Sequence, residues 1–139
     1  NVRLAAPLDD AQVAAAAARV GADRVVERLP GGWSHALGEH GATLSVGERQ
    51  LLSFARAIAA DPALLVLDEA TSAVDSEAEA RIQAGLASLM RGRTTIAIAH
   101  RISTIVGADR ILVLHHGQVV ERGRHAELLA RGGLYARLY

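Results

Sequence analysis

The stretch of sequence that decides the fold is Leu64-Leu65-Val66-Leu67-Asp68-Glu69-Ala70-Thr71-Ser72-Ala73-Val74-Asp75. It follows Asp61-Pro62, a pair that ends a helix. Residues 64–67 form a short apolar run without alternation, which predicts a strand buried on both faces, as in a parallel sheet covered by helices. The sequence therefore predicts an α/β fold organised around this strand.

Two carboxylates, Asp68 and Glu69, follow directly where this strand ends. In open α/β sheets the ligand crevice lies at the carboxyl ends of the strands. One acid can hold a metal ion while the other orients or deprotonates an attacking water. The same pair could instead open a helix, because acids favour helix N-termini. The catalytic interpretation therefore depends on the surrounding motifs.

The composition limits the classes of function. The chain has 139 residues, half of them hydrophobic, which is enough for one modest core. The formal net charge is zero and there is no basic run, which argues against a nucleic-acid surface. The absence of cysteine excludes disulfides and thiolate metal sites. No apolar run approaches the roughly 20 residues that span a bilayer, so any membrane role is expected to come through a partner or another segment.

All fifteen basic residues are arginine. A phosphate-binding loop of the form G-x-x-x-x-G-K-[ST] needs a lysine that reaches the β- and γ-phosphates, so this chain cannot contain one. The chain also begins without an initiator methionine. We therefore expect residues 1–7 to be a cut end rather than a natural start, and Asp68 and Glu69 to have no phosphate cradle within this sequence.

The remaining pattern alternates helices and strands. Asp9 and Asp10 are expected to cap the first helix and Gly21 to close it. We expect helices over residues 11–20, 23–29, 45–60, 76–90 and 124–130, a helix or turn over 102–107, a loop over 33–41, and strands over 64–67, 94–99, 111–115 and 118–121.

Residues 44–48, Leu-Ser-Val-Gly-Glu, open the helix that precedes the central strand. Ser45 and Glu48 have the spacing of a capping box, in which each side chain bonds the backbone N–H of the other residue. A serine and a glycine at a helix start also expose N–H groups and the positive end of the helix dipole to a phosphate. The plain cap is the more frequent arrangement, and the two interpretations are compatible.

Histidines give one further candidate site residue. His100 lies at the carboxyl end of strand 94–99, beside the acids if the two strands are neighbours. A lone histidine at a strand end is more often structural than catalytic. His115, His116 and His125 lack metal-ligand spacing, so we expect them on the surface.

In their order and spacing, residues 44–48, 64–69, 72–75 and His100 resemble the C-terminal part of the nucleotide-binding domain of ABC transporters of the exporter type. The resemblance extends over essentially the whole chain, including residues 38–41 and the tail 117–129. It implies a partial P-loop NTPase-like α/β domain, a parallel sheet flanked by helices. Residues 1–60 would be a portion of the helical signature subdomain, and residues 61–139 the C-terminal part of the RecA-like catalytic core.

The resemblance also implies roles for single residues. Asp68 would hold Mg²⁺, usually through water, and Glu69 would be the catalytic glutamate that polarises the attacking water. His100 would contact the γ-phosphate. The signature residues Ser45, Val46, Gly47 and Glu48 would contact, in trans, the nucleotide held by the opposite subunit. Residues 72–75, with Ser72 and Asp75, would form the D-loop at the dimer interface. Val46 and Glu48 replace a glycine and the glutamine of the usual Leu-Ser-Gly-Gly-Gln.

The implied function is MgATP hydrolysis coupled to transport, at the cytoplasmic face of a membrane. The partners would be a second nucleotide-binding domain in a head-to-tail dimer and a transmembrane domain, with no nucleic acid. The isolated 139 residues are expected to be inactive. Two alternatives stay open: an ABC ATPase of DNA repair or chromosome maintenance, for which heptad repeats and a basic surface are expected and not found, and a degenerate partner that only lends its signature helix.

Overall fold

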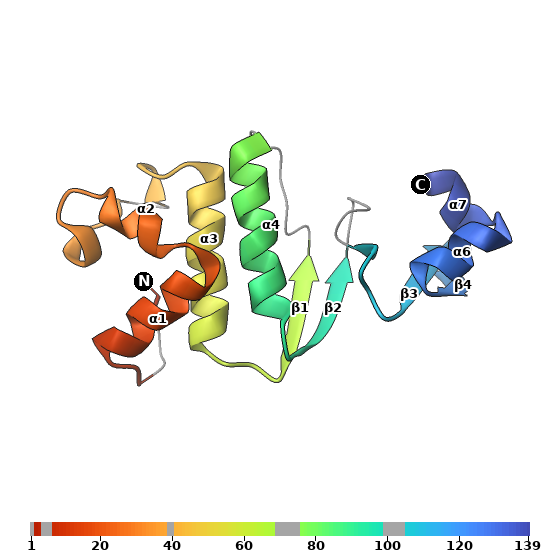
Figure 1. Ribbon diagram of the computed structural model, residues 1–139, viewed down its shortest axis with the longest axis horizontal. Coiled ribbons are helices and arrows are strands. Elements are labelled where there is room, and N and C mark those ends of the chain that lie inside the picture. The colour runs from red at the N-terminus through yellow and green to blue at the C-terminus, as the bar shows by residue number, and fades with distance from the viewer. Residues whose placement is uncertain (1, 4–6, 39–40, 69–75, 99–104) are drawn as a thin grey trace. The chain divides into compact units, whose positions relative to one another are not determined.

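The computed structural model describes residues 2–3, 7–38, 41–68, 76–98 and 105–139. The chain divides into two compact units, residues 1–96 and residues 97–139. The first unit contains α1 (Asp10–Val20), α2 (Asp23–Glu27), the 3₁₀ turn η1 (Gly32–Ser34), α3 (Val46–Ala59), β1 (Leu64–Asp68) and α4 (Ser76–Met90), and β2 (Thr94–Ile98) begins in it (Figure 1). The second contains β3 (Ile111–His115), β4 (Gln118–Gly123), α6 (His125–Arg131) and α7 (Leu134–Leu138).

Local capping explains the first two helices. Asp9 accepts a hydrogen bond from the Gln12 backbone N–H at 2.8 Å and completes a capping box, and Gly21 ends α1 with a left-handed φ of 74°. The predicted first helix, its Asp9 cap and its closing glycine are therefore confirmed, whereas Asp10 is the first helical residue and not a cap. Helix α2 ends at Glu27 rather than at the predicted residue 29. Leu29 precedes Pro30, and the residue before a proline avoids the helical region.

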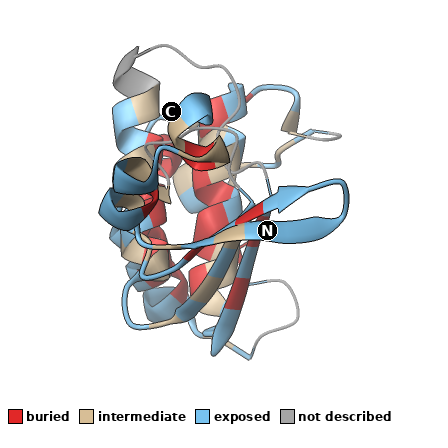
Figure 2. Cartoon of the chain, turned by 90° about the vertical axis from the view of Figure 1, so that its right-hand side faces the viewer, coloured by how far each residue is buried: buried red, intermediate tan, exposed pale blue. Residues whose placement is uncertain are grey.

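The core of the first unit lies between α1, α3 and α4, which pack against one another. Figure 2 shows the buried positions as red bands along the helices. Gly85 of α4 allows the close approach, because a β-carbon there would lie 3.1 Å from the Val20 backbone oxygen and 3.2 Å from Leu51 Cδ2. The two longer helices each bury one apolar face, with Leu51, Leu52, Ala55 and Ile58 on α3 and Ile82, Leu86 and Leu89 on α4.

Strands β1 and β2 pair as a two-stranded sheet, joined by α4, and both run in the same direction (Figure 1). Leu65 and Leu67 are buried, whereas Leu64 and Val66 are 52% and 62% exposed. The expectation of burial on both faces is therefore wrong for the part of the chain that the structure describes. Successive strand residues point to opposite faces, and only one face of β1 is covered.

Arg93 connects the segments that lead into these two strands. Its side chain, 7% exposed, donates to the Leu89 backbone oxygen at 2.9 Å and to Asp61 Oδ1 at 2.8 Å. Asp61 lies before β1 and Arg93 directly before β2. A charge-assisted hydrogen bond between the segments that precede β1 and β2 helps to align the two strands, and hence the carboxyl end of β1.

In the second unit, β3 and β4 form an antiparallel hairpin with an irregularity between Val113 and Leu114. Ile111, Val113, Leu128 and Tyr135 form its core. Both predicted strands are confirmed, and the second is longer than predicted. The predicted helix over 124–130 lies at His125–Arg131, one residue later.

Helix α7 is not among the helices predicted from the sequence, the last of which covers residues 124–130. Glu121 of β4 explains it: Oε1 and Oε2 accept from the backbone N–H groups of Leu134 and Tyr135 at 3.0 and 2.8 Å. Residues 102–104 of the predicted helix or turn lie outside the described residues, and residues 105–107 end in a turn. In the described part of the chain, no helix is long and apolar enough to cross a membrane.

Candidate functional site

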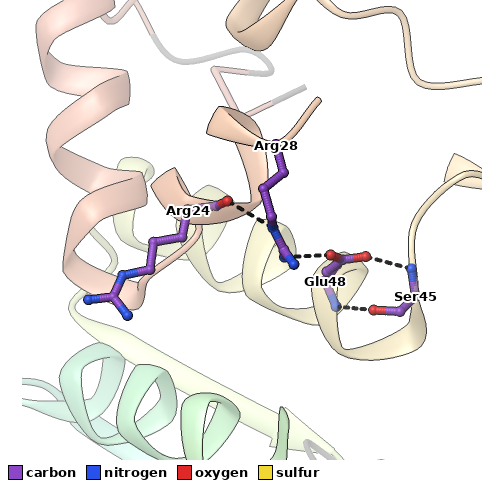
Figure 3. A network of polar contacts seen from close by, with 4 residues as sticks. All are labelled: Arg24, Arg28, Ser45 and Glu48. Carbon is purple, nitrogen blue, oxygen red and sulfur yellow. Dashed lines mark hydrogen bonds and ion pairs between the residues drawn. The ribbon is translucent and has the colours of Figure 1, made fainter. Parts of the chain in front are cut away.

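The first turn of α3 contains the motif Ser45-Val46-Gly47-Glu48, and Ser45 is its N-cap. Ser45 Oγ accepts from the Glu48 backbone N–H at 3.2 Å, and Glu48 Oε2 accepts from the Ser45 backbone N–H at 2.8 Å (Figure 3). The predicted capping box is therefore confirmed. The Ser45 hydroxyl hydrogen is not used in either bond, so it can donate to a further acceptor.

Arg28, the C-cap residue of α2, contacts this motif from the end of a different helix. One terminal nitrogen of its guanidinium donates to Glu48 Oε1 at 2.7 Å, and Nε donates to the Arg24 backbone oxygen at 3.2 Å (Figure 3). The sequence did not predict a role for Arg28. Arg28 and Glu48 are 20 residues apart on different helices, and no helical or strand periodicity relates such positions.

The pKa of Glu48 is lowered from its usual value. The largest cause is the hydrogen bond from the Ser45 backbone N–H, and the Ser45 side chain and the charges of Arg28 and Arg81 act in the same direction. Partial burial opposes them. Glu48 is therefore a carboxylate at neutral pH, and a cation lies directly against it.

The start of α3 is open to solvent at two of its residues. Ser45 is exposed, Val46 is 44% exposed, and Gly47 is buried. The first N–H groups of a helix have no intrahelical acceptor, and together with the helix dipole they favour an anion. The start of α3 is therefore suited to binding a phosphate, and Val46 leaves it accessible to solvent.

Asp68 is exposed at the carboxyl end of β1, as its place in the sequence predicted. A carboxylate oxygen is a ligand that Mg²⁺ prefers, so this residue fits the predicted metal role. The other predicted site residues, Glu69, Ser72, Asp75 and His100, lie outside the described residues.

The remaining histidines differ from one another. His115 and His116 are exposed, as expected. His125 was also expected on the surface, but it is half-buried and its Nδ1 lies 2.8 Å from the Tyr135 hydroxyl oxygen. The start of α6 packs beside α7, which the sequence did not predict. Among the described residues, no three histidines or acids gather as a metal-binding group.

The chain is similar in sequence to a known protein family and to several of its members. Residues 4–72 match the family model described as ABC transporter. The chain is 50% identical over 139 residues to the ABC transporter ATP-binding protein YknV of Bacillus subtilis, with 99% of the chain covered. It is 55% identical over 134 residues to an ATP-dependent lipid A-core flippase of Dechloromonas aromatica, with 96% covered.

A solved structure, that of a bacterial Atm1-family ABC exporter with ATP bound, is similar with a TM-score of 0.83 and 42% identity over 95% of the chain. This agreement confirms the predicted α/β fold. The chain spans 23% of the length of each of these three proteins.

Proposed function

This chain belongs to the ABC transporter family, as a C-terminal portion of an exporter-type ATP-binding domain, and from that membership we propose that the full-length protein hydrolyses MgATP to drive transport. The observation that carries the proposal is the start of α3. Its serine cap is exposed, its acid is paired with Arg28, and its free donors suit a phosphate.

The nucleotide site is composite. The start of α3 supplies phosphate donors, whereas the lysine that such a site needs is absent from these residues. We therefore assign Ser45, Val46, Gly47 and Glu48 to a nucleotide held mainly by a second ATP-binding domain in a head-to-tail dimer. A hydrogen bond from a helix-start hydroxyl to a phosphate oxygen is charge-assisted, which makes it strong and directional.

The chemistry is assigned to the carboxyl ends of the two parallel strands. Asp68 would hold Mg²⁺, which neutralises phosphate charge when bound. Glu69 would accept a hydrogen bond from the attacking water and orient it, and His100 would contact the γ-phosphate. Ser72 and Asp75 would line the dimer interface beside them.

The rest of the assembly follows from the family. A transmembrane domain would accompany this domain and place it at the cytoplasmic face of a membrane. Residues 1–60 would belong to the helical subdomain and residues 61–139 to the catalytic core. The exporters and flippases among the similar proteins favour transport over DNA repair. The isolated chain would be inactive, because phosphoryl transfer depends on a complete set of positioning groups.

The test is MgATP hydrolysis by the full-length protein and by the isolated chain. Glu69→Gln removes the carboxylate assigned to the attacking water with little change in volume and is expected to abolish turnover in the full-length protein. Glu27→Gln, the same change at an exposed acid of α2, is the matched control and is expected to leave turnover intact. Hydrolysis that survives Glu69→Gln, or turnover by the isolated chain, would refute the assignment.

A further inference from the structure

We propose that Arg28 is a positioning residue for the start of α3. It holds the Glu48 carboxylate against the Ser45 cap and balances its charge, so that the exposed donors of the first turn can receive an anionic phosphate. This inference rests on the proposed function, because it gives Arg28 a part in nucleotide binding. Nothing in the signature sequence itself points to this residue, which lies on a different helix.

The guanidinium is oriented by α2 and presented to α3. Its Nε donates to the Arg24 backbone oxygen at 3.2 Å, and a terminal nitrogen donates to Glu48 Oε1 at 2.7 Å (Figure 3). Arginine is suited to both bonds at once, because its donors lie in a rigid planar fork. Its place at the C-terminal end of α2 is also favourable, since cations stabilise the last carbonyl groups of a helix.

Arg28 completes the set of contacts around the acid. Glu48 Oε2 accepts from the Ser45 backbone N–H at 2.8 Å, and Oε1 accepts from Arg28, so each carboxylate oxygen has a partner. The carboxylate is thereby kept on the cap. Without Arg28, one oxygen would lose its cation and the side chain could rotate toward a ligand at the helix start.

This chain needs such a residue because position 48 is charged. The usual signature has a neutral glutamine where this chain has Glu48, and a carboxylate in the first turn would repel a bound phosphate. The Arg28 guanidinium is paired with this carboxylate at 2.7 Å and offsets its charge, and the charge of Arg81 acts in the same direction. We infer that Arg28 allows glutamate to occupy the glutamine position.

Arg24 provides a matched control on the same helix. It is exposed, and its side chain extends away from Glu48 in Figure 3, where only its backbone oxygen takes part in the network. Arg24→Ala therefore removes the same charge from α2 and leaves the contact with Arg28 in place.

The experiment measures KM and kcat for MgATP hydrolysis by the full-length protein carrying Arg28→Ala, Glu48→Gln, both changes, or Arg24→Ala. Exposed ion pairs are weak, so Arg28→Ala is expected to raise KM by about fivefold. In the Glu48→Gln background the same change is expected to alter KM by less than about twofold, because no charge remains to be balanced. Arg24→Ala is expected to leave KM unchanged.

A loss that is equal in both backgrounds would overturn the proposal, because Arg28 would then act on folding alone. An unchanged KM for Arg28→Ala would overturn it as well. Thermal melting is recorded in parallel. If the alanine variant melts early, Arg28→Gln, which keeps hydrogen-bonding groups without the charge, replaces it under the same criteria. Absence of hydrolysis by the unsubstituted protein would refute the proposed function itself, whereas normal hydrolysis with an unaffected Arg28→Ala would refute only the role of Arg28.

Discussion

Ser45 has two roles in this account, and two substitutions separate them. As a helix cap it accepts from the Glu48 backbone N–H, and as a signature residue it would donate to a phosphate. Ser45→Ala removes both functions. Ser45→Asp keeps a good N-cap acceptor and places a negative charge where the phosphate would bind.

The expected magnitudes differ between the two assays. Loss of a serine cap costs about 1 kcal/mol of unfolding free energy, which lowers the melting temperature by about 3–5 °C in a chain of this size. The aspartate variant should stay within about 0.5 kcal/mol of the unsubstituted protein, because aspartate and serine rank alike as caps. A lost hydrogen bond to a charged phosphate costs about 1.5–3 kcal/mol, which is roughly a tenfold to hundredfold loss of kcat/KM.

Stability is measured by urea unfolding, with circular dichroism as the readout. Activity is measured as MgATP hydrolysis by the full-length protein. We expect the alanine variant to lose stability and activity, and the aspartate variant to lose activity alone. An aspartate variant that hydrolyses MgATP normally would refute the phosphate role of Ser45. An alanine variant with unchanged urea midpoint would refute the cap.

Three further predictions concern the packing of the first unit, its acid dependence and its surface. Gly85→Ala gains about 1 kcal/mol of helix propensity but adds a β-carbon 3.1 Å from a backbone oxygen, which costs about 1–3 kcal/mol, so we expect a net destabilisation of about 1 kcal/mol. The exposed neighbour Ala84→Gly measures propensity alone, and a gain at Gly85 equal to the loss at Ala84 would contradict close packing. The lowered pKa of Glu48 means that its contribution to stability is complete above the ordinary glutamate pKa and is lost as the pH falls through the folded-state value. The urea midpoint should therefore fall as the pH is lowered from neutral into acid solution, and Glu48→Gln should remove the part of this fall that is due to Glu48. Exposed Val66 on the uncovered face of β1 should promote self-association, which sedimentation should show to decrease in Val66→Thr, a change that keeps strand propensity. An isolated chain that sediments as a monomer before and after the change would contradict this.

Most of the helices and strands could be predicted because their signals are local. The Asp9 cap, the Gly21 stop and the Ser45–Glu48 box each depend on residues within a turn of the helix end, so sequence spacing is sufficient to find them. Strand β3 was predicted for the same reason, from a short apolar run between turns.

The errors arose where distant segments decide the structure. Helix α7 exists because Glu121, on a strand, accepts from its first two N–H groups, and His125 is half-buried because that helix packs beside it. Arg28 was missed for the same reason, since its partner lies 20 residues away on another helix. An apolar run such as residues 64–67 shows what a strand can bury, but the covering elements decide which face is buried.

Contact between the start of α3 and a bound nucleotide can be measured as the rate of thiol modification there in the full-length protein. The 139 residues contain no cysteine, so Val46→Cys adds a single exposed thiol to this segment and leaves the Ser45 cap in place. Ala84→Cys, on the exposed side of α4, is the control. If the start of α3 contacts the γ-phosphate of a bound nucleotide, MgATP should slow modification at position 46 much more than MgADP does, and should leave position 84 unaffected. Equal rates at position 46 with MgATP, with MgADP and without nucleotide would contradict the account.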